Sequence, residues 1–158
     1  MTVTPDEFRA ALGHFATGVT ILTARDTKGV DHGMTVNSFT SVSLTPPLIL
    51  ACIANDADMH AVLRNATSFA INVLASDQEA WSRRFSDDRD DRFEGIPFTR
   101  NANGVILISG ALAHVECRRT SWQEAGDHGI CIGEVERSSV AAGEPLLYYR
   151  GAYSRMGR

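Results

Sequence analysis

The sequence is poor in cysteine, lacks a long apolar run and carries no excess of positive charge. Its three cysteines, Cys52, Cys117 and Cys131, are odd in number and widely spaced, so a disulfide framework is not expected. The longest apolar run covers residues 48–54 and is far too short to cross a bilayer, which argues against a membrane protein. The formal net charge is -4 and the charges are spread along the chain, so a nucleic-acid partner is not expected.

Several common signatures of nucleotide, metal and hydrolase sites are missing as well. No G-x-G-x-x-G, P-loop or G-x-S-x-G occurs, so any nicotinamide nucleotide is expected to dock transiently on a surface other than a Rossmann site. Cys117, His128 and Cys131 match no common zinc spacing, so no metal site is expected. The N-terminus lacks a basic region followed by an apolar stretch, so we expect no signal peptide and a cytoplasmic location.

What the chain does contain is the composition of a globular domain. With 158 residues, of which 44% are hydrophobic and 22% charged, it is predicted to form a single domain over residues 1–158. Thr4-Pro5-Asp6-Glu7 combines a capping threonine, a proline at the first helical position and a capping-box glutamate, so a helix begins here and is expected to end at Gly18. Further helices are predicted at 57–65 and, after a second capping box at 76–79, through Phe85.

Strand signals dominate the rest of the chain. About seven strands with hairpin-length connections are expected, including a hairpin between 105–108 and 111–118 joined at Ser109-Gly110. Strand patterns occur in eight segments, some of which can belong to one strand: 19–24, 34–44, 48–53, 69–74, 105–108, 111–118, 129–140 and 146–150. A doubly wound parallel sheet would need longer helices between strands, which the C-terminal half lacks. We therefore predict an all-β fold, a β-barrel with peripheral short helices.

The stretch 34–44 is the most informative. Its even positions are mostly apolar (Met34, Val36, Val42 and Leu44), whereas its odd positions carry hydroxyls or an amide (Thr35, Asn37, Ser41 and Ser43). This alternation predicts a strand with one dry face and one hydrogen-bonding face, and the broken phase at Ser38 predicts a bulge. The polar face can bind a phosphate, a ribityl chain or the edge of a heterocycle, although an exposed polar strand face is the alternative.

Two further side chains are candidates for ligand binding. Arg84, at the end of a predicted helix, can pair with a phosphate, or it can complement the helix C-terminus or pair with Asp87 and Asp88. His128 follows the turn at Gly126-Asp127 and can donate to a carboxamide or phosphate or shuttle a proton. An exposed loop histidine without a role is the alternative for His128.

Taken together, the segments GHFATGVT at 13–20 and GMTVNSFTSVSLTPPL at 33–48 resemble the short-chain flavin reductase family. These proteins are the reductase components of two-component flavin-dependent monooxygenases. Further matches are residues 69–74, Arg84-Phe85, 126–128, 133–135 and 148–153, so the resemblance covers nearly the whole chain in the same order.

The resemblance implies a split-barrel FMN-binding fold, a homodimer and a bound FMN or FAD. The flavin-binding residues that it implies are Thr35, Val36, Asn37, Ser38, Ser41, Cys52, Ile53, Arg84, Phe85 and Tyr153. Ser38, Ser41 and Arg84 would approach the flavin phosphate. Cys52 and Ile53 would face the edge of the isoalloxazine ring.

The resemblance also implies a reaction. His128 would lie near the nicotinamide of NADH or NADPH, and Tyr153 would pack near the flavin ring. Hydride would pass from nicotinamide C4 to flavin N5, with the protein supplying orientation, and a partner flavin-dependent oxygenase would consume the reduced flavin. Three alternatives use the same barrel: an oxidase of the pyridoxamine-phosphate-oxidase type that retains its flavin, a non-catalytic flavin-binding module and a heme-binding split barrel. The residues leave FMN against FAD, and NADH against NADPH, open.

Overall fold

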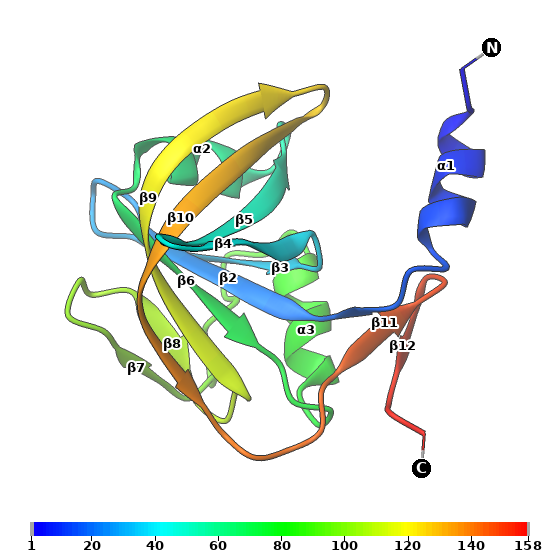
Figure 1. The fold of residues 1–158 in the computed structure, drawn as a ribbon. Coiled ribbons are helices and arrows are strands. Elements are labelled where there is room, and N and C mark those ends of the chain that lie inside the picture. Colours follow the sequence, from blue (N-terminus) through cyan, green and yellow to red (C-terminus); the bar gives the residue numbers. More distant parts are fainter. Residues whose placement is uncertain (1, 158) are drawn as a thin grey trace.

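The computed structural model describes residues 2–157, which form three short helices and twelve strands (Figure 1). In chain order these are α1 (Pro5–Leu12), β1 (Thr17–Gly18), β2 (Thr20–Arg25), β3 (Asp31–Val36), β4 (Phe39–Leu44), β5 (Pro47–Ala54), α2 (Asp58–Asn65), β6 (Ser68–Val73), α3 (Glu79–Ser86), β7 (Phe98–Arg100), β8 (Ile106–Ile108), β9 (Ala113–Ala125), β10 (His128–Val140), β11 (Leu147–Tyr149) and β12 (Ala152–Ser154). Among the described residues, no helix has the length and apolar character needed to cross a membrane.

One antiparallel sheet of seven strands forms the body of the molecule. Its order is β3-β2-β6-β9-β10-β5-β4, so β3 and β4 are its two edges. Only Asn37 and Ser38 separate these two strands in the chain. The sheet therefore curls until its edges meet, and because the ladders found within residues 2–157 do not join β3 to β4, the barrel stays split along this seam. The predicted all-β barrel with peripheral helices is confirmed.

The core is divided in two by the wall of the barrel. Neighbouring side chains on a strand point to opposite faces, so Leu22 of β2 joins one apolar cluster and Ile21 joins the other. The Leu22 cluster includes Phe69 and the inward face of α2, where Met59, Val62 and Leu63 are buried as predicted. The Ile21 cluster packs Phe85 of α3 against the outside of the sheet together with β8.

Buried polar side chains fasten β8 to the barrel. The Asn72 amide donates to the Ile21 carbonyl at 2.9 Å, and its oxygen accepts from the Ile108 amide at 2.8 Å. The Thr23 hydroxyl donates to the Ile106 carbonyl at 2.6 Å. Each of these buried polar groups is thereby satisfied, as burial requires.

Two helix boundaries differ from the sequence prediction. The capping box at Thr4 and Glu7 is present, but α1 ends at Leu12 rather than at Gly18. The second predicted capping box does not form, and α3 begins at Glu79. The side chain of Gln78 accepts instead from the Ala75 amide at 2.9 Å, so it stabilises the turn that precedes the helix.

Two strand predictions also need correction. The segment 105–108 does not form a hairpin with 111–118, because Asn101 organises a different turn: its side chain accepts from the amides of Asn103 and Val105 and directs β8 back onto β7. The segment 34–44 is two strands, and its apolar even positions are not all buried. Val42 is 48% and Leu44 is 92% exposed, because β4 is an edge strand.

Candidate active site

Three adjoining cavities surround the C-terminal end of α3. They have volumes of about 490, 580 and 210 Å³, and all three are lined by Ser86. Thr35 lines the first and third cavities, and Tyr148 and Tyr153 line the second and third. We call these three cavities together the α3 site. Its volume is typical of pockets that bind nucleotides and other small molecules.

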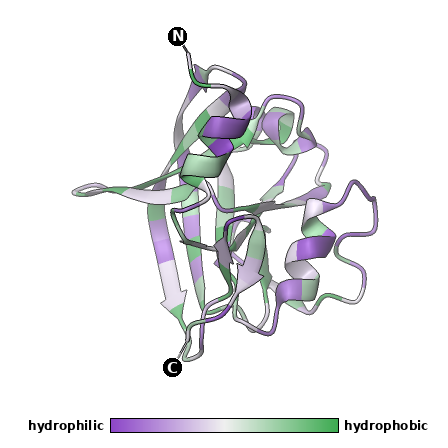
Figure 2. Cartoon of the chain, turned by 90° about the vertical axis from the view of Figure 1, so that its right-hand side faces the viewer, coloured by the Kyte–Doolittle hydropathy of each residue, from purple (hydrophilic) through white to green (hydrophobic). Residues whose placement is uncertain are grey.

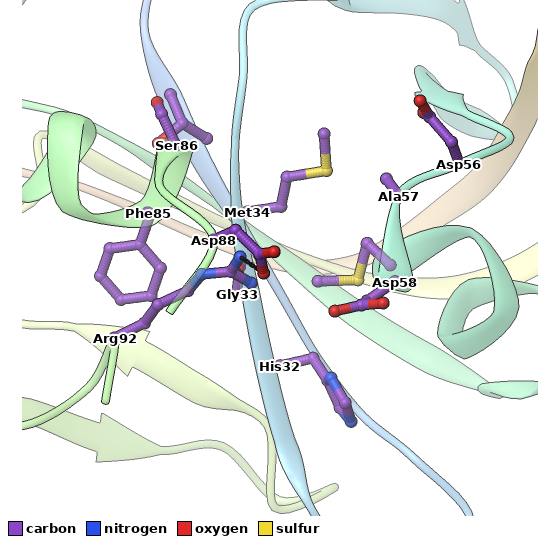
Figure 3. Close-up of a pocket in the computed structure, with 12 residues that line it drawn as sticks. His32, Gly33, Met34, Asp56, Ala57, Asp58, Phe85, Ser86, Asp88 and Arg92 are labelled. Atoms are coloured by element: carbon purple, nitrogen blue, oxygen red, sulfur yellow. Dashed lines mark hydrogen bonds and ion pairs between the residues drawn. The ribbon is translucent and has the colours of Figure 1, made fainter. Parts of the chain in front are cut away.

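The first cavity lies beside β3, at one edge of the split barrel (Figure 3). One wall is β3 from His32 to Thr35, the opposite wall is the connection from β5 into α2, and the third comes from α3 and the loop after it. Gly33 allows this arrangement, since a Cβ there would lie 2.5 Å from Cε1 of Phe85. Phe85, which was predicted to bind flavin, is 1% exposed and forms part of the cavity wall.

The arginine in the first cavity is Arg92 rather than the predicted Arg84. Arg92 donates to the Asp87 carbonyl at 2.9 and 2.7 Å and to the Gly33 carbonyl at 3.3 Å, which holds its guanidinium against β3. Arg84 donates to the Glu94 carbonyl at 2.7 Å and lines none of the three cavities. The sequence did not single out Arg92, because it lies in a loop among acidic residues.

The predicted flavin-binding residues Thr35, Val36 and Asn37 lie in different surroundings. The Thr35 hydroxyl donates to the Ser82 carbonyl at 2.6 Å, and Asn37 lines the third cavity. Val36 is buried, and its carbonyl accepts from Thr20. Thr35 and Asn37 therefore border the α3 site, whereas Val36 is part of the core.

Ser38 and Cys52 lie side by side where the chain passes from β3 to β4. The Ser38 hydroxyl donates to the Cys52 carbonyl at 2.7 Å. Burial raises the pKa of the half-buried Cys52 thiol, so it stays protonated near neutral pH. Ile53 is fully buried in the barrel and lines none of the three cavities. Ser41 is exposed on β4 opposite Ile49 and lines none of the three cavities.

His128 and His32 both pair with aspartates. His128 begins β10 opposite Ala54, and its Nδ1 lies 2.7 Å from Asp127, whose pKa is lowered chiefly by this hydrogen bond. The carbonyl of Asp127 accepts from the Asn55 amide, so His128 lies beside the connection that lines the first cavity. His32, which the sequence did not single out, lines this cavity directly, and its Nε2 lies 3.0 Å from Asp26.

Tyr153 forms a wall of the second and third cavities. Its hydroxyl lies 2.8 Å from the hydroxyl of Ser82, and the guanidinium carbon of Arg83 lies 4.6 Å from its ring centroid. The ring also meets Tyr148 edge to face at 5.4 Å. The predicted ligand residue Tyr153 is thus part of the α3 site, together with Tyr148, which the pattern alone did not single out.

The chemistry available in the α3 site is that of binding and orientation. It combines an amide, hydroxyls, two arginines (Arg83 and Arg92) and two tyrosine rings, which suits an aromatic heterocycle with a polar side chain. Within residues 2–157, no group of three or more His, Cys, Asp or Glu side chains is arranged to hold a metal ion.

Comparison with known proteins identifies the family. A family model described as "Flavin reductase like domain" matches residues 12–157. The FMN reductase (NADH) SmoA of Agrobacterium fabrum is 47% identical over 152 residues, which cover 96% of this chain and 86% of that protein. The reductase subunit HsaB of a flavin-dependent monooxygenase from Rhodococcus jostii is 39% identical, covering 96% of this chain and 78% of that subunit.

Solved structures agree with these relatives in fold. The Streptomyces globisporus NADH:FAD oxidoreductase SgcE6, in complex with NAD and FAD fragments, superposes with a TM-score of 0.92 at 40% identity, covering 99% of this chain and 97% of that one. The styrene monooxygenase flavin reductase of Pseudomonas putida superposes with a TM-score of 0.87 at 34% identity, covering 96% of this chain and 97% of that one. Since the family model and these relatives span almost the whole chain, the protein belongs to the flavin reductase like family.

Proposed function

We propose that this protein is an NADH-dependent flavin reductase that reduces FMN or FAD and passes the reduced flavin to a separate flavin-dependent monooxygenase. The observation that carries the proposal is the α3 site itself, where Thr35, Ser86 and Tyr153 from three distant segments border adjoining cavities. The proposal is supported by relatives with the printed names FMN reductase (NADH) and NADH-dependent flavin reductase. These names agree with the flavin reductase function expected from the sequence, which left NADH against NADPH open.

In this proposal the flavin lies along β3 at the seam. Asn37 and the backbone near Ser38 face its polar edge, and Tyr153 packs near its ring. Arg92 provides the positive charge nearest the first cavity for a flavin phosphate. The flavin supplies the hydride acceptor and NADH the hydride, so the protein mainly holds two rings in contact.

His128 has an orienting role in this proposal. Asp127 accepts from Nδ1 of His128, which leaves Nε2 for the carboxamide of the nicotinamide. No proton has to be moved by the protein for hydride transfer to occur. His128 therefore acts on the binding of NADH rather than on the chemical step.

We further propose that the chain acts as a single domain and forms a homodimer. Phe8 and Leu12 of α1 are 57% and 53% exposed, and Phe15, just after the helix, is 74% exposed. Figure 1 shows α1 standing apart from the barrel, and Figure 2 shows hydrophobic and hydrophilic residues side by side on it. An apolar helix face that its own chain leaves uncovered fits burial against a second copy.

We also propose a cytoplasmic location. The three cysteines are free thiols, as is usual in a reducing compartment. NADH, the proposed reductant, is available in the same compartment.

The test is a steady-state assay of NADH oxidation by the purified protein with no flavin, with FMN and with FAD. We expect turnover that depends on added flavin and is faster with NADH than with NADPH. An absence of flavin-dependent oxidation of either nucleotide would overturn the proposal. Flavin that stays bound through gel filtration together with amine oxidation would favour the oxidase alternative, and a Soret band on purification would favour heme binding.

A further inference from the structure

Ser82 lies at the point where three elements of the α3 site meet. It belongs to α3 and is completely buried. Its carbonyl accepts from the hydroxyl of Thr35 at 2.6 Å and from that of Ser86 at 2.9 Å. Its own hydroxyl lies 2.8 Å from the hydroxyl of Tyr153. One buried residue thus connects β3, the end of α3 and β12.

Each partner of Ser82 borders the α3 site, whereas Ser82 does not. Ser86 lines all three cavities, Thr35 lines two and Tyr153 lines two. Ser82 is absent from the lining of all three. Any influence of Ser82 on a ligand must therefore pass through the positions of these neighbours.

Of the contacts of Ser82, the hydrogen bond to Tyr153 matters most, because β12 is weakly anchored. β12 has three residues, and within residues 2–157 it pairs with β11 alone, so it is the outer strand of a three-stranded sheet. The Arg83 guanidinium covers the Tyr153 ring from an exposed position. The hydroxyl pair with Ser82 joins the ring to a buried point of the fold, 71 residues away in the chain. This bond fixes where the ring stands as a wall of the second and third cavities.

We propose that Ser82 is a positioning residue of the flavin site, which holds Tyr153 and Thr35 in the places that bind the flavin ring. The inference rests on the proposed flavin reductase function. When the Ser82 hydroxyl is removed, the Tyr153 ring loses its fixed place, and the site must order that ring each time a flavin binds. Removing the hydroxyl therefore weakens flavin binding, whereas hydride transfer in the enzyme with flavin bound is preserved.

The test compares Ser82→Ala, Tyr153→Phe and the double variant in the full-length protein. Flavin KM, flavin Kd from quenching of flavin fluorescence, and kcat at saturating flavin are measured for each. We expect each single variant to raise the KM and Kd for flavin by about fivefold to tenfold, the effect of one lost hydrogen bond. The double variant is expected to match the single variants, because all three lack the same bond. The kcat of Ser82→Ala at saturating flavin is expected to stay within about twofold of the wild type.

Matched controls are Tyr149→Phe, which removes a hydroxyl from the same hairpin, and Ser121→Ala, which removes one from an exposed position on β9. Both are expected to leave flavin KM unchanged. If Tyr153 acts only by touching flavin, Ser82→Ala alone leaves flavin KM unchanged, and the inference is overturned. Additive effects in the double variant overturn it as well.

The same assay separates this inference from the proposed function. A wild-type protein that oxidises NADH with flavin, together with unaffected variants, overturns only the role of Ser82. A wild-type protein without flavin-dependent turnover overturns both. If Ser82→Ala does not fold, the comparison of Tyr153→Phe with Tyr149→Phe decides, because Tyr153→Phe leaves the packing around the buried Ser82 intact. An unchanged flavin KM in Tyr153→Phe then overturns the inference.

Discussion

Ser38 and Cys52 exchange two hydrogen bonds at the junction of the two sheet edges. The Ser38 hydroxyl donates to the Cys52 carbonyl at 2.7 Å, and the Cys52 amide donates to the Ser38 carbonyl at 3.1 Å. The pair extends the ladder between β4 and β5 by one step beyond Phe39. It therefore fixes the end of the seam along which the proposed flavin lies.

Replacing Ser38 with alanine tests this junction. We expect Ser38→Ala to lower the free energy of unfolding by about 1 kcal/mol, because the Cys52 carbonyl loses its side-chain donor. Flavin KM should rise severalfold, since the chain entering β4 is held less firmly. Urea unfolding and steady-state kinetics measure the two effects. Ser41→Ala, three residues along on the exposed side of β4, is the matched comparison, and equal effects of the two substitutions would contradict the role given to Ser38.

The close packing of β3 against α3 gives a second prediction. A methyl group at position 33 would lie 2.5 Å from Cε1 of Phe85 and 2.9 Å from Cζ of Phe93. We expect Gly33→Ala to destabilise the protein by about 2 kcal/mol, as overpacking does, and to distort the first cavity. Gly18→Ala is the control, because the corresponding Cβ would meet no atom within 4 Å. Thermal unfolding should distinguish the two variants, and equal midpoints would show that β3 and Phe85 can move apart at little cost.

The positions of two arginines give a third prediction. Arg92 lines the first cavity, whereas Arg84 binds the Glu94 carbonyl outside it. We expect Arg92→Gln to raise flavin KM at least about tenfold, by loss of a charged partner for the phosphate. The effect should shrink as salt is added. Arg84→Gln should leave flavin KM close to the wild-type value. If Arg84→Gln raised flavin KM more than Arg92→Gln, the phosphate would belong to Arg84, as the family resemblance implied.

Two buried thiols predict a loss of stability at high pH. Burial raises the pKa of Cys117 and of Cys131 to about 12, from about 9 in the unfolded chain. As the pH rises above about 9, the unfolded state releases these protons while the folded state keeps them, so the free energy of unfolding falls. The expected loss is about 2 kcal/mol per thiol by about pH 10.5. Urea unfolding across this range should show a shallower pH dependence in Cys131→Ala than in the wild type, and parallel curves would be evidence against buried, protonated thiols.

The strands and the inward face of α2 could be predicted because each has a burial pattern that the sequence displays. Residues 69–74 and 129–140 overlap β6 and β10 closely, and Met59 and Leu63 are buried as the helical spacing required. The short strand β7 could not be predicted in the same way. All three of its side chains are exposed, so it has no alternation to detect, and it forms only because the turn at Asn101 places it beside β8.

The candidate site was predictable where it follows one strand and not where it depends on loops. The run from Thr35 to Asn37 was found because its polar side chains alternate along a strand. Arg92 and Arg84 both stand among acidic residues in the sequence, and only the path of the chain after α3 decides which one reaches the cavity. Ser82 has no sequence signal, since its importance comes from contacts with residues far along the chain.

The apolar face of α1 gives the last prediction. None of the residues of α1 is buried, so the helix adds little to the core of its own chain. A second copy that covers Phe8 and Leu12 would remove their exposed apolar surface from water. We expect the wild type to sediment as a dimer and Phe8→Glu/Leu12→Glu to sediment as a folded monomer, with unchanged far-UV circular dichroism. Ala10→Glu adds a negative charge to another side of the same helix and should leave the dimer intact. A wild-type monomer, or a dimer that tolerates both glutamates, would mean that α1 does not hold two copies together.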